Sequence, residues 1–381
     1  MEYRLDELFD LQMGKTPSRN NSEYWDSEHH KWISIGDLSK CGKYIYETKE
    51  YLSDKAVKES GISLIPANTV IMSFKLSIGK TAITPEPMYS NEAIMSFRDK
   101  KVIELMPDYV YYMFSGKDWD TGTNKAVMGK TLNKATLSQI RIKVHSLPEQ
   151  QQIVSVLDKA KAIIDARLQE LQALDDLIKA RFVEMFGDYD LSHQRQNWIP
   201  ISEIGKVVGG STPKTSVSEY WNGEYRWISP AEIQADSGVI YDSVKKITKA
   251  GAESCSLQEL PIGTVILSSR APVGKVAIAG NTFYCNQGFK NIICNSRIIP
   301  RYLYSLLLFN TEYLNSLGRG ATFKEISKSI VENIKIPLPE IAEQKEFETF
   351  VKHIDKSRVV VQKALDEAQL LFDSLMQQYF G

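Results

Sequence analysis

Two long stretches of the chain carry apolar residues at alternating spacings of three and four positions. These stretches, Glu149–Phe186 and Glu343–Phe380, contain no proline or glycine, and a glycine follows each of them. The spacing places apolar side chains on one face of an α-helix, and its persistence over several heptads is typical of a coiled-coil seam. Glycine is common just after a helix. The sequence therefore predicts two long helices, over residues 148–187 and 339–381.

Each predicted helix carries an apolar stripe that would extend roughly 55 Å, at about 1.5 Å per residue. A stripe of this length needs a partner that covers it. The nearest candidate is the other helix of the same chain, and a coiled coil between two chains is the alternative. The seam residues that we expect at this contact are Leu157, Ile164, Leu171, Ile178, Val351, Ile354, Leu365 and Phe372.

Outside the long helices, the pattern is that of a mixed α/β protein. Short β-rich runs such as Thr69–Phe74 and Thr264–Ser268 follow a proline and a turn, and they predict strands. Pro107 and Pro300 each precede a short amphipathic segment, as expected for proline at the first position of a helix. These signals predict one α/β domain in residues 1–147 and, after a linker, a second in residues 188–338.

The second half of the chain is a diverged copy of the first. Matched segments recur at offsets of 193 to 196 residues, and the small drift is expected when insertions lie in surface loops. Each copy therefore consists of an α/β domain followed by a long helix. The clearest matches are Thr16-Pro17 with Thr212-Pro213, Ser22–Trp25 with Ser218–Trp221, Lys31–Ser34 with Arg226–Ser229, and Phe186-Gly187 with Phe380-Gly381.

Composition places the chain among ordinary globular proteins. A length of 381 residues suits two or three domains, and 43% apolar with 24% charged residues is sufficient for a core and a polar surface. The first seven residues carry acids where a secretory signal needs an apolar core, and the most apolar short run, Tyr302–Phe309, is too short for a bilayer. We therefore expect a cytoplasmic protein. Its four cysteines show no metal-ligand spacing and are expected to be reduced thiols.

The net charge of −1 argues at first against a nucleic-acid-binding protein, but the charge is unevenly distributed. The two helical segments, Glu149–Gly187 and Glu340–Gly381, together hold 10 basic and 15 acidic residues. The rest of the chain then holds 36 basic and 32 acidic residues, a net charge of +4. This bias permits phosphate binding by the α/β domains without proving it.

Motifs for catalysis and for cofactor binding are missing from the sequence. Gly-Lys-Thr occurs at 14–16, 79–81 and 129–131, but none of the three has the earlier glycine that a phosphate-binding Walker A loop requires. There is no GxGxxG, no (N/D)PP(Y/F) tetrapeptide of adenine methyltransferases, and no HExxH. Pro107-Asp108 has no convincing ExK downstream, so a nuclease site is not indicated. We therefore expect a recognition protein that is not an enzyme and holds no metal or cofactor.

Three short loops with glycine, small polar residues and cations recur at matched places in the two copies. Lysine and arginine can neutralise phosphates, and arginine can also read base edges, so these loops are candidates for DNA binding. For any single loop an ordinary solvated turn is the alternative, and recurrence in both copies favours the functional interpretation. Trp32 and Trp227 are expected in the core rather than stacked on bases. The candidate DNA-binding residues are Lys15, Thr16, Ser18, Arg19, Lys75, Ser77, Lys80 and Lys130 in the first copy, and Thr212, Lys214, Ser269, Arg270, Lys275, Arg319 and Lys324 in the second.

The order of these motifs resembles that of a known family. Over essentially its whole length, the chain is similar to the specificity subunit of type I restriction–modification enzymes. The similarity lies in the order of the motifs, which is G-x-TP, SEYW, (K/R)WIS, TVI, GK, N(E/Q) and a proline-rich run ending in EQ. The most specific parts are Asn286-Gln287-Gly288, Gly320-Ala321-Thr322 and Ile336–Gln344. The first copy departs from the pattern at Asn91-Glu92-Ala93 and at Val144–Pro148.

The resemblance implies an α+β protein of pseudo-twofold shape. Two target-recognition domains would be held apart by the two long helices, paired as an antiparallel coiled coil. Each domain would read one half of a bipartite, asymmetric site in double-stranded DNA. The helices would dock two methyltransferase (modification) subunits, which carry S-adenosylmethionine, and restriction motor–nuclease subunits would join the complex. The alternative function is a non-catalytic protein-binding scaffold with paired helices, whose binding need not weaken with added salt.

Overall fold

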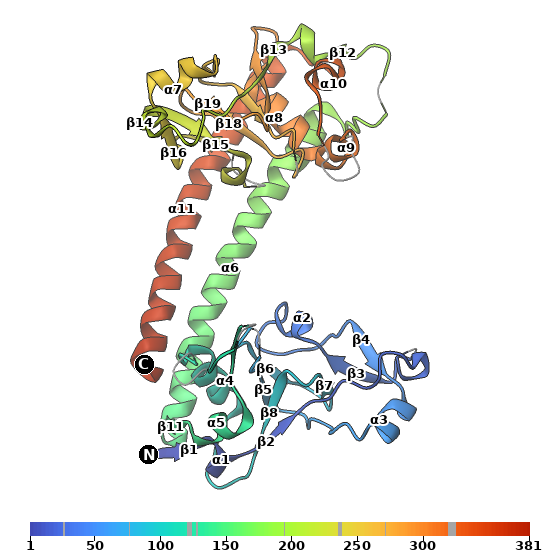
Figure 1. Cartoon of the computed structure of the whole chain (residues 1–381), viewed down its shortest axis with the longest axis vertical. Helices are drawn as coiled ribbons and strands as arrows, with labels where there is room; N and C mark the ends of the chain where they lie inside the picture. The colour runs from blue at the N-terminus through green and yellow to red at the C-terminus, as the bar shows by residue number, and fades with distance from the viewer. Residues whose placement is uncertain are drawn as a thin grey trace. The chain divides into compact units, whose positions relative to one another are not determined.

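The computed structural model divides into two compact units (Figure 1). The first unit comprises residues 1–168 and 363–381, and the second comprises residues 169–362. Each unit therefore contains one α/β domain and part of both long helices. The structure describes residues 1–25, 27–75, 77–119, 124–126, 129–193, 195–234, 238–270, 272–318 and 325–381, with the backbone alone at 124–126 and 129–131.

A four-stranded antiparallel sheet forms the centre of the first unit. Its order is β2 (Phe9–Met13), β8 (Ile94–Asp99), β5 (Thr69–Ser73) and β6 (Thr81–Thr84). Val70 and Met72 of β5 enter one hydrophobic core, and Ile71 enters another core on the opposite face. Because both faces are covered, β5 is a continuous apolar run rather than an alternating one. The strand predicted at 69–74 is confirmed, and it ends one residue earlier.

Smaller elements complete the first unit. A second sheet pairs β3 (His30–Ile33) with β4 (Glu50–Leu52) and, in parallel, with β7 (Tyr89–Ser90). Helix α4 (Pro107–Gly116) begins at a proline, as predicted. The remaining elements are β1 (Glu2–Arg4) paired with β11 (Arg141–Lys143), β9 (Asn124–Ala126) paired with β10 (Gly129–Thr131), η1 (Ser22–Tyr24), α1 (Leu5–Leu8), α2 (Ile35–Leu38), α3 (Asp54–Ser60) and α5 (Lys134–Gln139).

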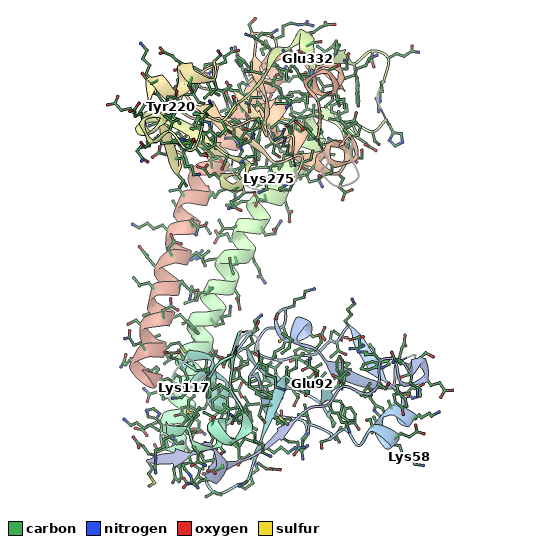
Figure 2. The ribbon with its side chains drawn as sticks, in the orientation of Figure 1. Lys58, Glu92, Lys117, Tyr220, Lys275 and Glu332 are labelled. Carbon is green, nitrogen blue, oxygen red and sulfur yellow. The ribbon has the colours of Figure 1, made fainter. Side chains whose placement is uncertain are left out.

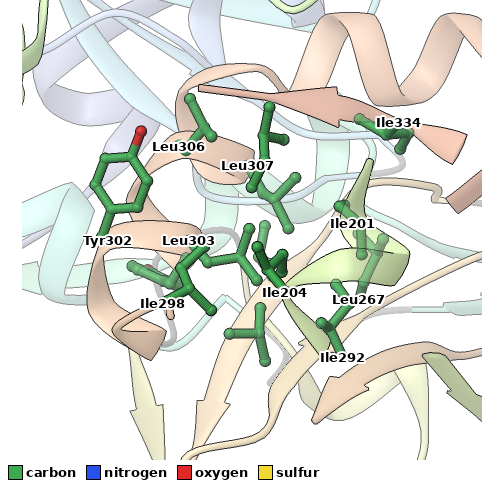
Figure 3. Close-up of a cluster of buried hydrophobic side chains, with 14 of the residues drawn as sticks. Ile201, Ile204, Leu267, Ile292, Ile298, Tyr302, Leu303, Leu306, Leu307 and Ile334 are labelled. Carbon is green, nitrogen blue, oxygen red and sulfur yellow. The ribbon is translucent and has the colours of Figure 1, made fainter. Parts of the chain in front are cut away.

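The second unit repeats this arrangement around a five-stranded sheet. Its order is β13 (Gly205–Gly209), β20 (Lys290–Cys294), β17 (Val265–Leu267), β18 (Val276–Ala279) and β15 (Val239–Ile240), of which β15 alone is parallel to its neighbour. Val265 and Leu267 face one core, which Figure 3 shows in close-up, and Ile266 faces the other. The strand predicted at 264–268 is therefore confirmed as β17.

The other elements of the second unit also match those of the first. Strand β14 (Trp221–Ile228) lies between β16 (Lys245–Ile247) and β19 (Tyr284–Cys285), and its pairing with β19 is parallel, like that of β3 with β7. Helix α8 (Pro300–Phe309) begins at the predicted proline. The remaining elements are β12 (Ile199–Pro200) paired with β21 (Lys335–Ile336), η2 (Ile201–Glu203), η3 (Ser218–Tyr220), η4 (Pro230–Glu232), α7 (Lys249–Ser254), α9 (Thr311–Ser316) and α10 (Lys328–Asn333).

Two helices of 40 residues each follow the α/β domains, as the apolar spacing predicted. They are α6 (Leu147–Phe186) and α11 (Ile341–Phe380). Gly187, at a φ of +91°, follows α6 in the left-handed conformation that ends many helices. The first half of α6 belongs to the first unit and its second half to the second unit, and α11 is divided in the reverse order.

Within the second unit the two helices run antiparallel. Arg181 of α6 forms an ion pair with Glu346 of α11 at 2.8 Å, and Asp175 of α6 pairs with Arg358 of α11. The earlier residue on one helix thus meets the later residue on the other. The rings of Phe182 and Phe347 pack edge to face between them, 5.4 Å apart. This confirms the antiparallel helix pair within one chain.

The predicted seam residues are all buried or half-buried. Towards the ends of the helices, however, the seam is part of the domain cores rather than of a separate rod. Leu157 belongs to the core of the first unit, and Phe372 packs against it. Val351 belongs to the core of the second unit, and Ile178 packs against it. The same apolar stripe therefore pairs the helices and fastens them to the α/β domains.

Candidate nucleic-acid interface

The predicted loops of the first unit converge at one end of its central sheet. Met13 at the end of β2 pairs with Met95, and Ser73 at the end of β5 pairs with Ile94, so the loops 14–19 and 74–80 leave the sheet on the same side. The Leu132 N–H donates to the Phe74 carbonyl at 3.1 Å, which brings the end of the third loop to the same place. Three loops that are far apart in sequence thus form one surface.

The second unit places its loops in the same way. Gly209 at the end of β13 pairs with Lys290, and Leu267 at the end of β17 pairs with Val276. The Ile326 N–H donates to the Ser269 carbonyl at 2.9 Å, so the segment that follows the third loop also reaches this end. Figure 2 labels Glu92 in the first unit and Lys275 in the second, one in each of these loop clusters.

A fourth element, which the sequence analysis did not assign to the site, lies among the loops. It is a tight turn in which Asn91 Oδ1 accepts the Ala93 N–H at 3.0 Å, and Asn286 Oδ1 accepts the Gly288 N–H at 2.8 Å. The next side chain is tied to the first loop, because Thr16 donates its hydroxyl hydrogen to Glu92 and Thr212 donates to Gln287. The repeat of Asn followed by Glu or Gln was the signal that could have identified this turn.

The glycines of the first loop serve the chain's own backbone. A Cβ on Gly14 would lie 2.2 Å from the carbonyl oxygens of both Ser90 and Asn91, and one on Gly210 would lie 2.1 Å from the Cys285 carbonyl oxygen. Contacts this short are impossible for a side chain, so glycine is needed where the first loop crosses the turn. Gly14 and Gly210 therefore have a role inside the fold, because only glycine lets the first loop pass so close to the turn.

Buried tryptophans fix the course of the same loop. Trp32 and Trp227 are 2% and 4% exposed, and their indole N–H groups donate to the carbonyls of Lys15 and Ser211, each at 3.1 Å. The core position predicted for both is confirmed. A second tryptophan in each copy holds the next turn, since Trp25 donates to the Ser18 carbonyl at 3.1 Å and Trp221 to the Lys214 carbonyl at 3.2 Å. The side chains of Ser18 and Lys214 remain exposed.

The candidate cations of the first unit differ in their surroundings. Both terminal nitrogens of Arg19 bind the Glu50 carboxylate, and the guanidinium lies 3.8 Å above the Trp25 ring. Lys80 donates to the Ser39 hydroxyl at 2.6 Å, and Lys15 donates to the Ser60 carbonyl. Lys75 is half-buried, with its ammonium 5.3 Å from the centre of the Phe74 ring, and Ser77 lies in the same turn with its carbonyl accepting the Ser73 hydroxyl hydrogen.

Two candidate cations of the second unit also have intramolecular partners. Lys275 donates to the Ile233 carbonyl at 2.7 Å, and Arg270 Nε donates to the Glu325 carboxylate at 3.1 Å. Lys290, which the sequence analysis did not select, donates to the Ser269 hydroxyl at 3.3 Å. The loop cluster of the second unit therefore contains one more cation than predicted.

One matched position differs in charge between the two units. The Thr16 hydroxyl, with smaller contributions from Lys75 and Arg19, lowers the pKa of Glu92 below its ordinary value. Glu92 is thus an ionised acceptor among basic residues, while Gln287 at the matched place is neutral and can also donate. The two loop clusters share a backbone design and present different chemistry.

Three candidates cannot be placed. Arg319 and Lys324 lie outside the described residues, and for Lys130 only the backbone, in β10, is described.

Among the residues that the structure describes, no group of three or more His, Cys, Asp or Glu side chains could hold a metal ion. Burial raises the pKa of the Cys285 and Cys294 thiols to about 12, as expected for inert structural thiols. Within the same described ranges, no helix combines the length and apolar character needed to cross a bilayer.

The duplicated α/β domain and the two paired long helices define a tandem-repeat α+β protein. The chain belongs to the family described as the type I restriction modification DNA specificity domain, whose model matches residues 1–174 and 197–368. The two matched ranges correspond to the two copies.

Curated relatives carry the same description. The chain is 39% identical over 185 residues to the type I restriction enzyme MjaIX specificity subunit of Methanocaldococcus jannaschii, a match that spans 47% of this chain and 43% of that protein. It is 26% identical over 301 residues, 73% of the chain and 68% of the relative, to the putative MjaX specificity subunit of the same organism. To the Escherichia coli EcoR124I/EcoR124II specificity subunit it is 29% identical over 156 residues, 38% of the chain and 37% of the relative. The chain thus matches less than half the length of the first of these relatives.

Solved structures show the same fold. A chain from a study of complex assembly and conformational transition in the type I restriction–modification system aligns with a TM-score of 0.62 at 16% identity, covering 100% of this chain and 97% of the other. The S subunit of a type I system from M. genitalium aligns with a TM-score of 0.57 at 14% identity, covering 100% and 96%.

Proposed function

We propose that this chain is the non-catalytic subunit that recognises DNA sequence for a type I restriction–modification complex. Each α/β domain would read one half of a bipartite, asymmetric site in double-stranded DNA. The observation that carries the proposal is that, in each unit, the first two matched loops and the segment that follows the third meet at one end of a sheet, where cations gather. Membership of the DNA specificity family supports the same function.

The different side chains of the two loop clusters support different half-sites. Lys75 in the first unit stands where the second unit has Arg270, and Glu92 stands where it has Gln287. A lysine is a point charge suited to phosphate, while arginine and glutamine present paired groups that match base edges. Two copies with one backbone and different donors would therefore read two different short sequences.

The helices are proposed to dock the partner subunits. In the first unit, Ile163 on α6 and Leu370 on α11 are exposed, and in the second, Leu177 on α6 and Val360 on α11 are exposed. Large exposed apolar side chains on a regular surface mark protein contacts. We assign this surface to two methyltransferase (modification) subunits, which would hold S-adenosylmethionine, while this chain would hold no cofactor. Restriction motor–nuclease subunits would join that complex.

A protein-binding scaffold with paired helices is the alternative function, and the exposed apolar side chains alone are compatible with it. Salt separates the two functions, because DNA binding releases counterions and scaffold binding need not. For 6–10 phosphate contacts, DNA affinity falls by about 10³- to 10⁵-fold between 50 and 200 mM salt.

The test measures binding of the full chain, alone and with a methyltransferase subunit, to fluorescent random-sequence duplex DNA at several salt concentrations. We expect a steep loss of affinity with salt, and methyl transfer from labelled S-adenosylmethionine only when the methyltransferase subunit is present. Absence of DNA binding at low salt would contradict the proposal, and methyl transfer by the chain alone would contradict its non-catalytic role.

A further inference from the structure

Arg270 differs from the other candidate cations in the part of its side chain that forms a hydrogen bond. Its Nε donates to Glu325 Oε2 at 3.1 Å, and the side chain is 48% exposed. Within the described part of the chain, its two terminal Nη nitrogens have no hydrogen-bond partner. The guanidinium is therefore held at Nε, while about half of the side chain is accessible to solvent.

Two of the other candidates already use their terminal nitrogens within the chain. Both Nη nitrogens of Arg19 bind Glu50, and the Nζ of Lys275 donates to the Ile233 carbonyl at 2.7 Å. A group whose donors are already satisfied gains little by exchanging them for a base or a phosphate. Of Arg19 and Arg270, the two candidate arginines that the structure describes, Arg270 is the one whose Nη nitrogens are not used by the pairing.

Glu325 is itself fixed in place. It forms an antiparallel bridge with Arg270, and the Ile326 N–H beside it donates to the Ser269 carbonyl at 2.9 Å. Lys290, 13% exposed, places its Nζ 3.5 Å from Glu325 Oε1. One carboxylate between two cations leaves a net positive charge, so the cluster both orients Arg270 and attracts DNA.

We propose that Arg270 reads a guanine in the second half-site, with its two Nη nitrogens donating to guanine O6 and N7, and that Glu325 is the residue that positions it. This inference rests on the proposed function. A guanidinium edge matches the two acceptors of guanine in the major groove, and no other base presents that pair. Holding Nε to a carboxylate lowers the conformational freedom that the arginine loses on binding.

The first unit supplies a matched control. Lys75 stands at the place of Arg270, and its ammonium lies 5.3 Å from the centre of the Phe74 ring. A lysine lacks the planar pair of donors, so Lys75 is assigned to a phosphate. The two positions should respond differently to substitution.

The experiment selects binding sites from randomised duplex DNA with the full chain in its methyltransferase complex, for the wild type and for Arg270→Lys, Glu325→Gln and Lys75→Ala. Arg270→Lys keeps the charge and removes the paired donors. It should reduce the preference for guanine at one position of one half-site by roughly 5- to 150-fold, and leave the salt dependence unchanged. Glu325→Gln should weaken the same preference by less, because it keeps the size of the side chain and removes its charge. Lys75→Ala should weaken binding to all DNA sequences alike. It should also reduce the salt slope, the slope of log affinity against log salt concentration, by about 1.

The outcomes distinguish this inference from the proposed function. If the wild type selects a bipartite site and Arg270→Lys selects the same site with the same base preferences, Arg270 does not read a base. If Arg270→Lys weakens the preference for guanine and Glu325→Gln does not, Glu325 does not position Arg270, although Arg270 still reads the base. If the wild type enriches no sequence, the proposed function fails and the inference fails with it. Thermal unfolding midpoints equal to that of the wild type show that altered selection does not come from misfolding.

Discussion

Gln150, in the first turn of α6, accepts a hydrogen bond from the backbone N–H of Met106 at 3.0 Å, one residue before α4. Gln344 repeats the contact in the second copy, accepting from the Ile299 N–H at 2.8 Å, one residue before α8. Each glutamine also donates its Nε2 hydrogens to two backbone carbonyls, and the side chains are 1% and 0% exposed. A buried amide therefore helps the apolar stripe to join each long helix to its α/β domain.

Gln344→Ala should strongly destabilise the second unit. The substitution removes three hydrogen bonds, to the Ile299 N–H and to the carbonyls of Arg297 and Pro339, and leaves a cavity at a fully buried side chain. Each lost hydrogen bond costs about 0.5–1.5 kcal/mol, and more where the group that remains is out of reach of water. We expect the free energy of unfolding, measured in urea, to fall by about 2–4 kcal/mol in total. Gln378→Ala, at an exposed position of the same helix, is the control and should change it by less than about 0.5 kcal/mol.

Gly14→Ala should disrupt the first loop, because its Cβ would lie 2.2 Å from two backbone oxygens of the turn at Ser90 and Asn91. Backbone cannot give way as a flexible side chain can, so we expect a loss of at least about 2 kcal/mol in unfolding free energy. Gly42→Ala is the control, since a Cβ there has nothing within 4 Å. It should leave stability unchanged or slightly higher. Equal effects of the two substitutions would contradict the account of the loop.

Glu92→Gln tests the charge of the matched turn position. The pKa of Glu92 is lowered mainly by the Thr16 hydroxyl, so its ionised form stabilises the fold above its ordinary pKa, and this stabilisation is lost as pH falls through the lower folded-state pKa. The thermal midpoint of the wild type should exceed that of Glu92→Gln at neutral pH. The difference should shrink below about pH 4.5. A difference that does not depend on pH would show that the charge has no role.

Arg19→Ala and Lys75→Ala should separate stability from DNA binding. Arg19 is saturated by Glu50 and stacked on Trp25, so its removal should lower the unfolding free energy by about 1 kcal/mol, while the salt slope of DNA binding is kept. Lys75→Ala should leave the unfolding free energy nearly unchanged and reduce the salt slope by about 1. The reverse pattern would assign the phosphate contact to Arg19.

The parts of the fold with strong local patterns could be predicted from the sequence. Helix α6 could be predicted because the apolar spacing over Glu149–Phe186 and the glycine that follows are local signals. In the same way, Pro107 indicated the start of α4. The repeat predicted an α/β domain followed by a long helix in each copy, whereas the two compact units divide both long helices between them. Short elements such as β7, whose two residues are defined only by pairing with β3, had no such signal.

The site was less predictable, because its details depend on partners distant in sequence. Arg19 meets Glu50 and Lys80 meets Ser39, 31 and 41 residues away, and no local pattern reveals such pairs. The role of Gly14 likewise depends on the turn at Asn91. Glu92 and Gln287 could have been found, since the repeat of Asn followed by Glu or Gln was already visible.

The most direct test of the central claim is selection of binding sites from randomised duplex DNA by the full chain in complex with a methyltransferase subunit. Two loop clusters with the same backbone and different side chains predict a bipartite site with two different halves around an unread spacer. Replacing the loop residues of the first unit by their counterparts in the second should then convert one half only. A palindromic site, a single uninterrupted site, or no enrichment at all would contradict the account.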